Sequence, residues 1–186
     1  MVDVLKKIGT FFLDTIETIV VALAIFVVIY LFLVQPHQVK GNSMVPNFID
    51  GEYILTDKIS YRLNPPQHGD VVVFKAPKDH EVDYIKRIIG TPGDVVRVSD
   101  GKIYLNNEPL NESFLPSDYV TNPGIFARSD EDLIVPPNEY FVLGDNRSHS
   151  SDSREWGFVK KEEIIGKAWL RYWPLSELGF VQKVDF

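Results

Sequence analysis

The sequence predicts a mainly β protein, with an antiparallel or mixed β-sheet domain behind one N-terminal transmembrane helix. Three observations predict this class. A long apolar run lies near the N-terminus. The rest of the chain is rich in short segments of β-branched and aromatic residues, separated by Gly, Pro, Asn and Asp. No long helical period appears outside the first segment. The 186 residues are enough for an anchor and one domain with its own core.

The first predicted element is a transmembrane signal-anchor helix over residues 16–34. Its central part, "IVVALAIFVVIYLFLV", contains no charge, no Gly and no Pro. At about 1.5 Å per residue, such a run covers most of a hydrocarbon layer roughly 30 Å thick. A buried core helix is the alternative, but a run that is apolar on every face favours the membrane.

Cleavage of this helix as a signal peptide is not expected. The apolar run is too long, and the following "VQPHQVKGN" has no pair of small residues at the required spacing. Lys6 and Lys7 precede the run, and the positive-inside rule therefore places residues 1–15 in the cytoplasm. Residues 35–186 would then form an extracytoplasmic domain attached to the cell membrane by a single span.

Six segments of this domain are predicted to contain strands, and "SDGK" at 99–102 is typical of a hairpin turn. From about residue 95 to 138 we expect an irregular insertion. Its part from residue 108 onward contains five prolines and several acidic residues, and has the weakest pattern. The segments with a strand pattern are 52–59, 70–76, 83–90, 94–107, 139–145 and 164–173.

Composition excludes several classes of protein. The formal charge of −7 argues against a nucleic-acid partner, which requires a basic surface. The absence of cysteine excludes disulfides, cysteine-ligated zinc and a cysteine nucleophile. His37, His68 and His80 are scattered and have few acidic residues at ligand spacing, so neither a metal nor a cofactor is expected.

Ser43, in "GNSMVP", is the first candidate for chemistry. A serine in a turn usually has a structural role. Here Gly41 allows a close approach of the backbone, and Pro46 fixes the direction in which the chain leaves. A serine in such a bend can present its own N–H beside its hydroxyl, which supplies half of an oxyanion hole.

Lys86, in "DYIKRIIGTPGD", is the second candidate. Alternate residues of a strand share a face, so Lys86 lies with Tyr84 and Ile88, and Arg87 lies with Ile85. Both cations could extend to solvent at the edge of the sheet. If Lys86 is buried instead, desolvation lowers its pKa and the neutral amine can act as a general base.

The third candidate is the polar loop "GDNRSHSSDSREWG" at 144–157. Its charges alternate in sign and can build a salt-bridged platform beside a site, although a solvated loop is the simpler interpretation. His149 introduces a rival, because Ser43, His149 and Asp152 could form a conventional triad. The spacing does not decide between Lys86 and His149. The charged residues are Asp145, Arg147, Asp152 and Arg154.

Taken together, these pieces resemble a type I signal peptidase, or leader peptidase, of the Gram-positive kind. The resemblance runs from the anchor to about Pro174, and the motifs "GNSMVP", "HGDVVVF", "DYIKRIIGTPGD" and "GDNRSHSSDSREWG" carry it in order. It implies a serine endopeptidase with a Ser/Lys dyad that removes signal peptides from exported preproteins.

Site residues follow from the same resemblance. It implies that Ser43 is the nucleophile and Lys86 the general base, and it makes a triad with His149 improbable. Some relatives have a serine at the position of Gly41, whose hydroxyl completes the oxyanion hole; here a backbone N–H or a water would have to replace it. The residues implied to support the site are Ser150, Asp152, Arg154 and Asp145.

The substrate is expected to bind as an added strand along these motifs. The resemblance implies shallow apolar pockets for small residues, of the Ala-x-Ala type, at the first and third positions before the cleaved bond. Shallow pockets reject large side chains by steric clash. The expected partners are the lipid bilayer and preproteins that emerge from the export machinery. Candidate pocket residues are Val39, Met44, Phe48, Tyr84 and Ile85.

Three alternatives remain. An inactive membrane-anchored homologue could serve as a binding or scaffold protein, but such relatives lack the serine or the lysine, and this chain has both. A self-cleaving Ser/Lys repressor would carry a DNA-binding region where this chain has its anchor. A specialised peptidase for one secreted substrate fits the sequence as well.

Overall fold

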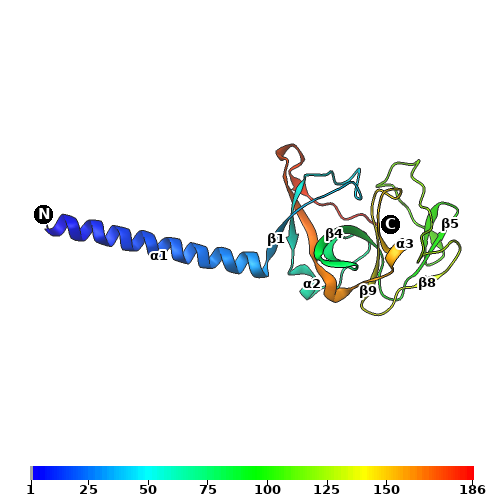
Figure 1. Cartoon of the computed structure of the whole chain (residues 1–186), viewed down its shortest axis with the longest axis horizontal. Coiled ribbons are helices and arrows are strands. Elements are labelled where there is room, and N and C mark those ends of the chain that lie inside the picture. The colour runs from blue at the N-terminus through cyan, green and yellow to red at the C-terminus, as the bar shows by residue number, and fades with distance from the viewer. Residues whose placement is uncertain (1) are drawn as a thin grey trace.

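A computed structural model describes the backbone of residues 2–186 and the side chains of residues 6–30 and 32–186. The first element, α1 (Val2–Phe32), projects from the rest of the chain as a single long helix (Figure 1). Its stretch Lys6–Tyr30 is long and apolar enough to cross a membrane, and none of its most apolar window is buried against the domain. A helix of this length and composition fits a single membrane span.

The helix ends slightly earlier than residue 34, where we expected it to end. Val34 already belongs to strand β1 (Val34–Gln38), which pairs antiparallel with β2 (Tyr53–Asp57). Pro36 explains the difference, because the residue before a proline disfavours helical geometry. The domain therefore begins directly at the end of the helix (Figure 1).

The larger sheet has the order β1-β2-β11-β3-β4-β9-β10, and β12 pairs with β11. Its neighbouring strands run antiparallel, which confirms the mainly β class predicted from the sequence. The central strands read as nearly continuous apolar runs because both of their faces are covered. The remaining strands of this sheet are β3 (Val71–Ala76), β4 (Asp79–Gly90), β9 (Glu139–Leu143), β10 (Val159–Lys160), β11 (Ile164–Trp173) and β12 (Gly179–Phe180).

Most of the strands in the expected insertion form a second, smaller sheet of order β7-β6-β5-β8. Asp100 and Gly101 both have positive φ, as a tight hairpin turn between β5 and β6 requires. Residues 110–132 contain no helix or strand, so the irregular part is shorter than the expected range of about 95–138. The strands are β5 (Val95–Ser99), β6 (Lys102–Leu105), β7 (Glu108–Pro109) and β8 (Leu133–Ile134).

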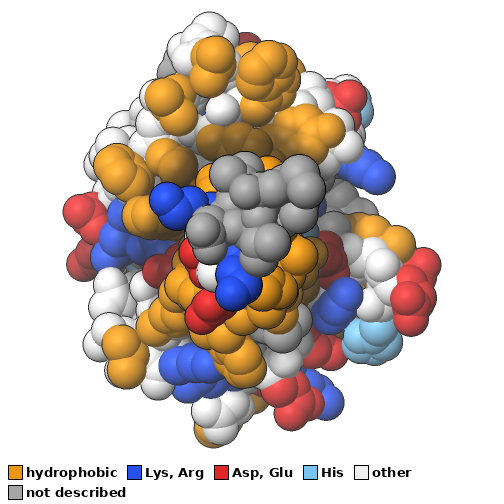
Figure 2. Space-filling view, turned by 90° about the vertical axis from the view of Figure 1, so that its left-hand side faces the viewer, with side chains coloured by type: hydrophobic (Ala, Val, Ile, Leu, Met, Phe, Trp, Pro, Cys, Tyr) orange, Lys and Arg blue, Asp and Glu red, His pale blue; other side chains and the backbone are white. Residues whose placement is uncertain are grey.

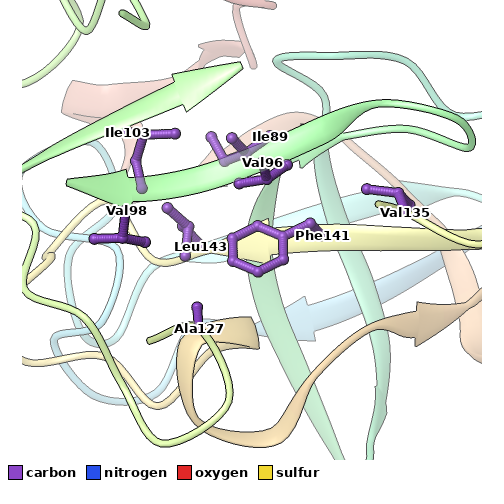
Figure 3. Packing of buried hydrophobic residues seen from close by; sticks show 8 residues of the cluster. All are labelled: Ile89, Val96, Val98, Ile103, Ala127, Val135, Phe141 and Leu143. Atoms are coloured by element: carbon purple, nitrogen blue, oxygen red, sulfur yellow. The ribbon is translucent and has the colours of Figure 1, made fainter. Parts of the chain in front are cut away.

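An apolar core joins the two sheets (Figure 3). Phe141 and Leu143 of β9 and Ile89 of β4 pack against residues of β5 and β6. Each buried side chain of this size contributes about 1.5–3 kcal/mol relative to an exposed one. The small sheet is therefore fixed to β4, which contains Lys86, and to β9, which leads into the polar loop at 144–157. The other members of the core are Val96, Val98, Ile103, Ala127 and Val135.

Short helices fill the remaining connections. Two of them are α-helical, α2 (Ser60–Leu63) and α3 (Ser153–Trp156), and two are 3-10 turns, η1 (Lys161–Glu163) and η2 (Leu175–Glu177). Large apolar side chains stay exposed along β11, η2 and β12. Figure 2 looks at the domain from the side of α1 and shows hydrophobic side chains gathered on that face. The exposed residues of these three elements are Trp169, Trp173, Leu175, Leu178 and Phe180.

Candidate active site

Ser43 lies in the loop between β1 and β2, residues 39–52, which we call the serine loop. The backbone N–H of Val39 donates to the carbonyl of Glu52 at 2.8 Å and closes this loop at its base. Gly41 has φ +81, a conformation that other residues adopt only with strain, and its N–H donates to Asp50 Oδ1 at 2.6 Å. Ser43 is therefore held in a bend beside the sheet, outside any strand.

Lys86 extends from β4 toward this loop. Its Nζ lies 2.8 Å from Ser43 Oγ and 2.9 Å from the carbonyl oxygen of Ile85. The same nitrogen lies 5.3 Å from the centre of the Tyr84 ring. Only 3% of Lys86 is exposed, so the amine contacts the serine hydroxyl in a site nearly closed to water.

The surroundings of Lys86 favour its neutral form. Burial lowers the pKa of Lys86 from its usual 10.5 to about 8, against the opposing charges of Asp152 and Asp145. Desolvation acts on the ammonium form, and neither carboxylate forms an ion pair with this amine. About a tenth of the amine is thus uncharged at pH 7, several hundred times more than at the usual pKa, which suits a general base.

Arg87 is the second cation of the same strand and is buried as well, with 2% of its surface exposed. Its guanidinium donates to both carboxylate oxygens of Asp145, at 2.8 and 2.6 Å, and to the carbonyl of Gly69 at 3.0 Å. Asn47 of the serine loop donates to the same carboxylate at 2.9 Å. This pair, which the sequence pattern did not reveal, ties the serine loop to β4 and β9.

Asp152 holds the polar loop in place. One of its carboxylate oxygens accepts from the backbone N–H of Gly144 at 3.1 Å, and the guanidinium of Arg154 donates to both oxygens at 2.8 and 2.9 Å. Arg154 also donates to the carbonyl of Arg147 at 2.7 Å. The alternating charges therefore form a connected platform, as the sequence suggested, although Asp145 pairs with Arg87 outside the loop.

Gly144 lies where the platform meets the serine loop. A Cβ at this position would collide with Ser150 Oγ and with the carbonyl oxygen of Ser43. Ser150 Oγ is buried and makes no hydrogen bond to the described residues. The backbone N–H of Asn146 donates to the Ser43 carbonyl at 3.0 Å, and its side chain donates to the Asn42 carbonyl at 3.0 Å. Asn146 thus holds the backbone of the serine loop from the side of the platform, another contact that spacing alone did not indicate.

His149, the rival base, lies elsewhere. Its side chain is exposed, and its backbone N–H donates to the carbonyl of Asn146 at 3.1 Å. Asp152, the third member of the alternative triad, is paired with Arg154. The geometry brings Lys86 to Ser43 and does not build the triad. Among the described residues, no group of three or more His, Asp or Glu is placed to hold a metal ion.

A cavity of about 290 Å³ runs along Ser43 and Lys86. Val39, Tyr84 and Ile85 line it, where we expected substrate-binding residues. Met44 and Phe48 do not line it; they are 1% and 2% exposed and pack in the apolar core behind it, because this part of the loop turns inward. Lys40, which precedes Ser43 in the stretch expected to flank the substrate, lines it too. The sequence analysis missed His37, Gln38, Ile54, Val73, Val82, Asp83 and Ser151, which also line the cavity.

Comparison with known proteins gives a consistent result. The family described as "Signal peptidase, peptidase S26" matches residues 12–173 of this chain. A protein named probable signal peptidase I-2 from Synechocystis is 38% identical over 173 residues, which are 89% of this chain and 75% of that protein. Signal peptidase IB of Staphylococcus aureus is 37% identical over 181 residues, which are 90% of this chain and 93% of that protein.

A solved structure is also similar to this chain. The crystal structure of a signal peptidase I from Enterococcus faecalis is 32% identical in sequence, with a TM-score of 0.47. The match covers 56% of this chain and 97% of that chain.

Proposed function

The chain belongs to the signal peptidase family, peptidase S26, and from this we propose that it cleaves signal peptides from exported preproteins, with Ser43 as nucleophile and Lys86 as general base. The family is one of serine endopeptidases, so the reaction class is established. The observation that carries the assignment of the two residues is the 2.8 Å contact between Lys86 Nζ and Ser43 Oγ, at an amine that is 3% exposed.

The reaction follows from this geometry. Neutral Lys86 takes the proton of Ser43 Oγ while the oxygen attacks the carbonyl carbon of the residue before the cleaved bond. The resulting ammonium then donates that proton to the departing amine, which leaves an acyl-enzyme. A water molecule, deprotonated by the neutral lysine, hydrolyses the ester and restores Ser43. One nitrogen thus serves as base and acid in turn, as it does in related Ser/Lys arrangements.

The carbonyl oxygen of the substrate becomes negatively charged during the attack, and hydrogen-bond donors must stabilise it. The N–H of Ser43 can supply one, because the serine lies in a bend with its amide beside its hydroxyl. Gly41 has no side chain that could supply the second donor, so a backbone N–H or a water would fill that role. The contacts from Asn146, Asn47 and Asp145 keep this loop in position before the substrate arrives.

The cavity supports the substrate class. Val39 and Ile85 give it apolar walls next to the dyad, and a space of about 290 Å³ suits small side chains. Segments 38–40 and 83–85 flank an extended peptide and can bond its main chain. Large residues next to the cleaved bond would clash with these walls.

The helix α1 supports attachment to the cell membrane. We propose that residues 1–15 lie in the cytoplasm and that residues 35–186 face the outside, as the positive charges of Lys6 and Lys7 favour. The apolar part of a signal peptide lies in the same bilayer. Enzyme and substrate would then meet by diffusion in two dimensions.

Cleavage by the full-length protein in detergent tests the proposal. A precursor whose signal ends in Ala-x-Ala is incubated with the protein, and the mature product is measured by gel and mass spectrometry. We expect Ser43→Ala and Lys86→Ala each to abolish processing, and His149→Ala to retain most of it. Retained cleavage in Lys86→Ala, together with its loss in His149→Ala, would replace the dyad with the triad.

A further inference from the structure

A polar pair lies in the cavity away from the dyad. His37 Nε2 and Asp83 Oδ2 are 3.3 Å apart, and their side chains are 13% and 23% exposed. Both line the same cavity as Ser43 and Lys86, beside the apolar walls of Ile54, Val73 and Ile85. Two titratable side chains therefore face the substrate space, and the chemical steps use neither of them.

Neighbouring side chains hold this pair in one arrangement. Thr56 Oγ1 lies 2.8 Å from His37 Nδ1, and Lys75 Nζ lies 2.8 Å from Asp83 Oδ1. Burial lowers the pKa of His37 despite the nearby Asp83, so the ring is neutral near pH 7. The Thr56 hydroxyl can donate to Nδ1 or accept from it, and Gln35 Nε2 lies 3.3 Å from His37 Nε2. These contacts fix the position of the ring, with Nε2 facing Asp83.

Asp83 can accept a further hydrogen bond. An ionised carboxylate offers about four acceptor positions. His37 and Lys75 lie within ion-pair distance of its two oxygens, and Oδ1 accepts no hydrogen bond from the described residues. Lys75 balances its charge, so a cationic substrate group gains little at this point. A neutral donor such as a hydroxyl is the group that the remaining positions suit best.

The position of the pair along the substrate follows from strand geometry. Asp83 lies two residues before Ile85 in β4, on the same face of the strand and about 7 Å away at the usual rise. An extended substrate covers the same distance in two residues, so a first-position side chain beside Ile85 places the third-position side chain beside Asp83. β1, which carries His37, starts directly after α1 (Figure 1).

We infer that His37 and Asp83 form a hydroxyl-accepting subsite, which selects Thr or Ser over an apolar residue of equal size at the third position before the cleaved bond. The inference rests on the proposed function. A hydroxyl at this position donates to Asp83, whereas the methyl group of a valine removes water from the pair and returns no hydrogen bond. Thr and Val have nearly the same shape, so they isolate this difference.

Two peptides test the subsite. They share one sequence with Ala directly before the cleaved bond and differ only in Thr or Val at the third position. With the full-length protein in detergent, we expect kcat/KM to be about tenfold higher for the Thr peptide, as one hydrogen bond to a charged group implies. Asp83→Asn removes the charged acceptor and should bring this ratio close to one, and His37→Leu, which removes the neighbour that orients the carboxylate, should lower it severalfold.

Two matched variants serve as controls. His80→Leu and Asp79→Asn make the same changes at exposed positions of the same strand, and both should keep the wild-type ratio. A wild-type ratio near one overturns the subsite without the use of any variant, as does an unchanged ratio in both His37→Leu and Asp83→Asn. If the wild-type protein cleaves neither peptide nor an Ala-x-Ala precursor, the proposed function itself fails.

Discussion

Lys86 and Arg87 are neighbours in β4, are equally buried, and face opposite sides of the strand. On one side, Lys86 Nζ meets Ser43 and a backbone carbonyl, with no ion pair to a carboxylate. On the other side, Arg87 has a carboxylate that accepts two of its hydrogen bonds. Burial disfavours charge on both sides, and only the second side compensates for it. Under the proposed mechanism, one strand thus provides a general base and a charged support at adjacent positions.

The largest expected effect on this contrast comes from replacing Lys86 with arginine, the other cation of the strand. Lys86→Arg places a group that stays protonated beside Ser43. Because it can no longer accept the serine proton, we expect kcat to fall by about 10³-fold or more. Preprotein cleavage by the full-length variant measures this loss. Appreciable activity in Lys86→Arg would show that the base is another group.

The pH dependence of the reaction tests the lowered pKa of Lys86. The pKa of Lys86 is lowered to about 8 by burial, and the base is the deprotonated form, so activity rises with pH up to that value. The neutral fraction increases roughly fiftyfold between pH 6 and pH 8 and changes little above pH 9. Initial rates of peptide cleavage across this range, at peptide concentrations below KM, test the expectation. A flat profile from pH 6 to pH 10 would contradict it.

The opposite exchange, Arg87→Lys, tests the ion pair between Arg87 and Asp145. An ammonium keeps the charge but cannot donate to both oxygens of Asp145 in a planar fork. We expect the free energy of unfolding of the domain to decrease by about 1–2 kcal/mol, with most of the activity retained. Urea unfolding, followed by tryptophan fluorescence, measures the change. An equal loss of activity in Arg87→Lys and Lys86→Arg would mean that the two sides do not have separate roles.

A smaller effect is expected from Asp152→Asn. The charge of Asp152 raises the pKa of Lys86 against the larger effect of burial. With this charge removed, the pKa should move below about 8, and the midpoint of the pH profile should shift to lower pH by less than one unit. Asp132→Asn, an exposed residue paired with Arg97, is the control and should leave the midpoint unchanged. A shift to higher pH would contradict the sign of this charge effect.

Much of the fold could be read from residue patterns. The anchor, the six strand segments and the hairpin at 99–102 all rely on local signals, such as apolar runs, alternation and turn residues. The missed elements are short or depend on their partners. β1 contains a proline and no apolar alternation, and it becomes a strand because β2 pairs with it.

The candidate site divides in a similar way. The motifs identified Ser43, Lys86 and the charged loop as the places to look, because residue type and local geometry restrict the possible chemistry. Arg87 as the partner of Asp145, and Asn146 as a clamp on the serine loop, could not be found from the sequence. These contacts join residues far apart in the chain, so only the folded arrangement decides them. The burial of Met44 and Phe48 in the apolar core is likewise decided only by the folded arrangement.

By itself, the sequence determined that the chain has a long apolar N-terminal segment, a β domain and a serine and a lysine within family motifs. Spacing alone did not determine whether the lysine or the histidine would reach the serine, and only the family resemblance implied the lysine. The tertiary structure decided this by closing β4 over the serine loop, which buries Lys86 and leaves His149 in water. The physical reason is desolvation. Burial lowers the pKa of this amine to about 8, and burial is a property of the whole fold.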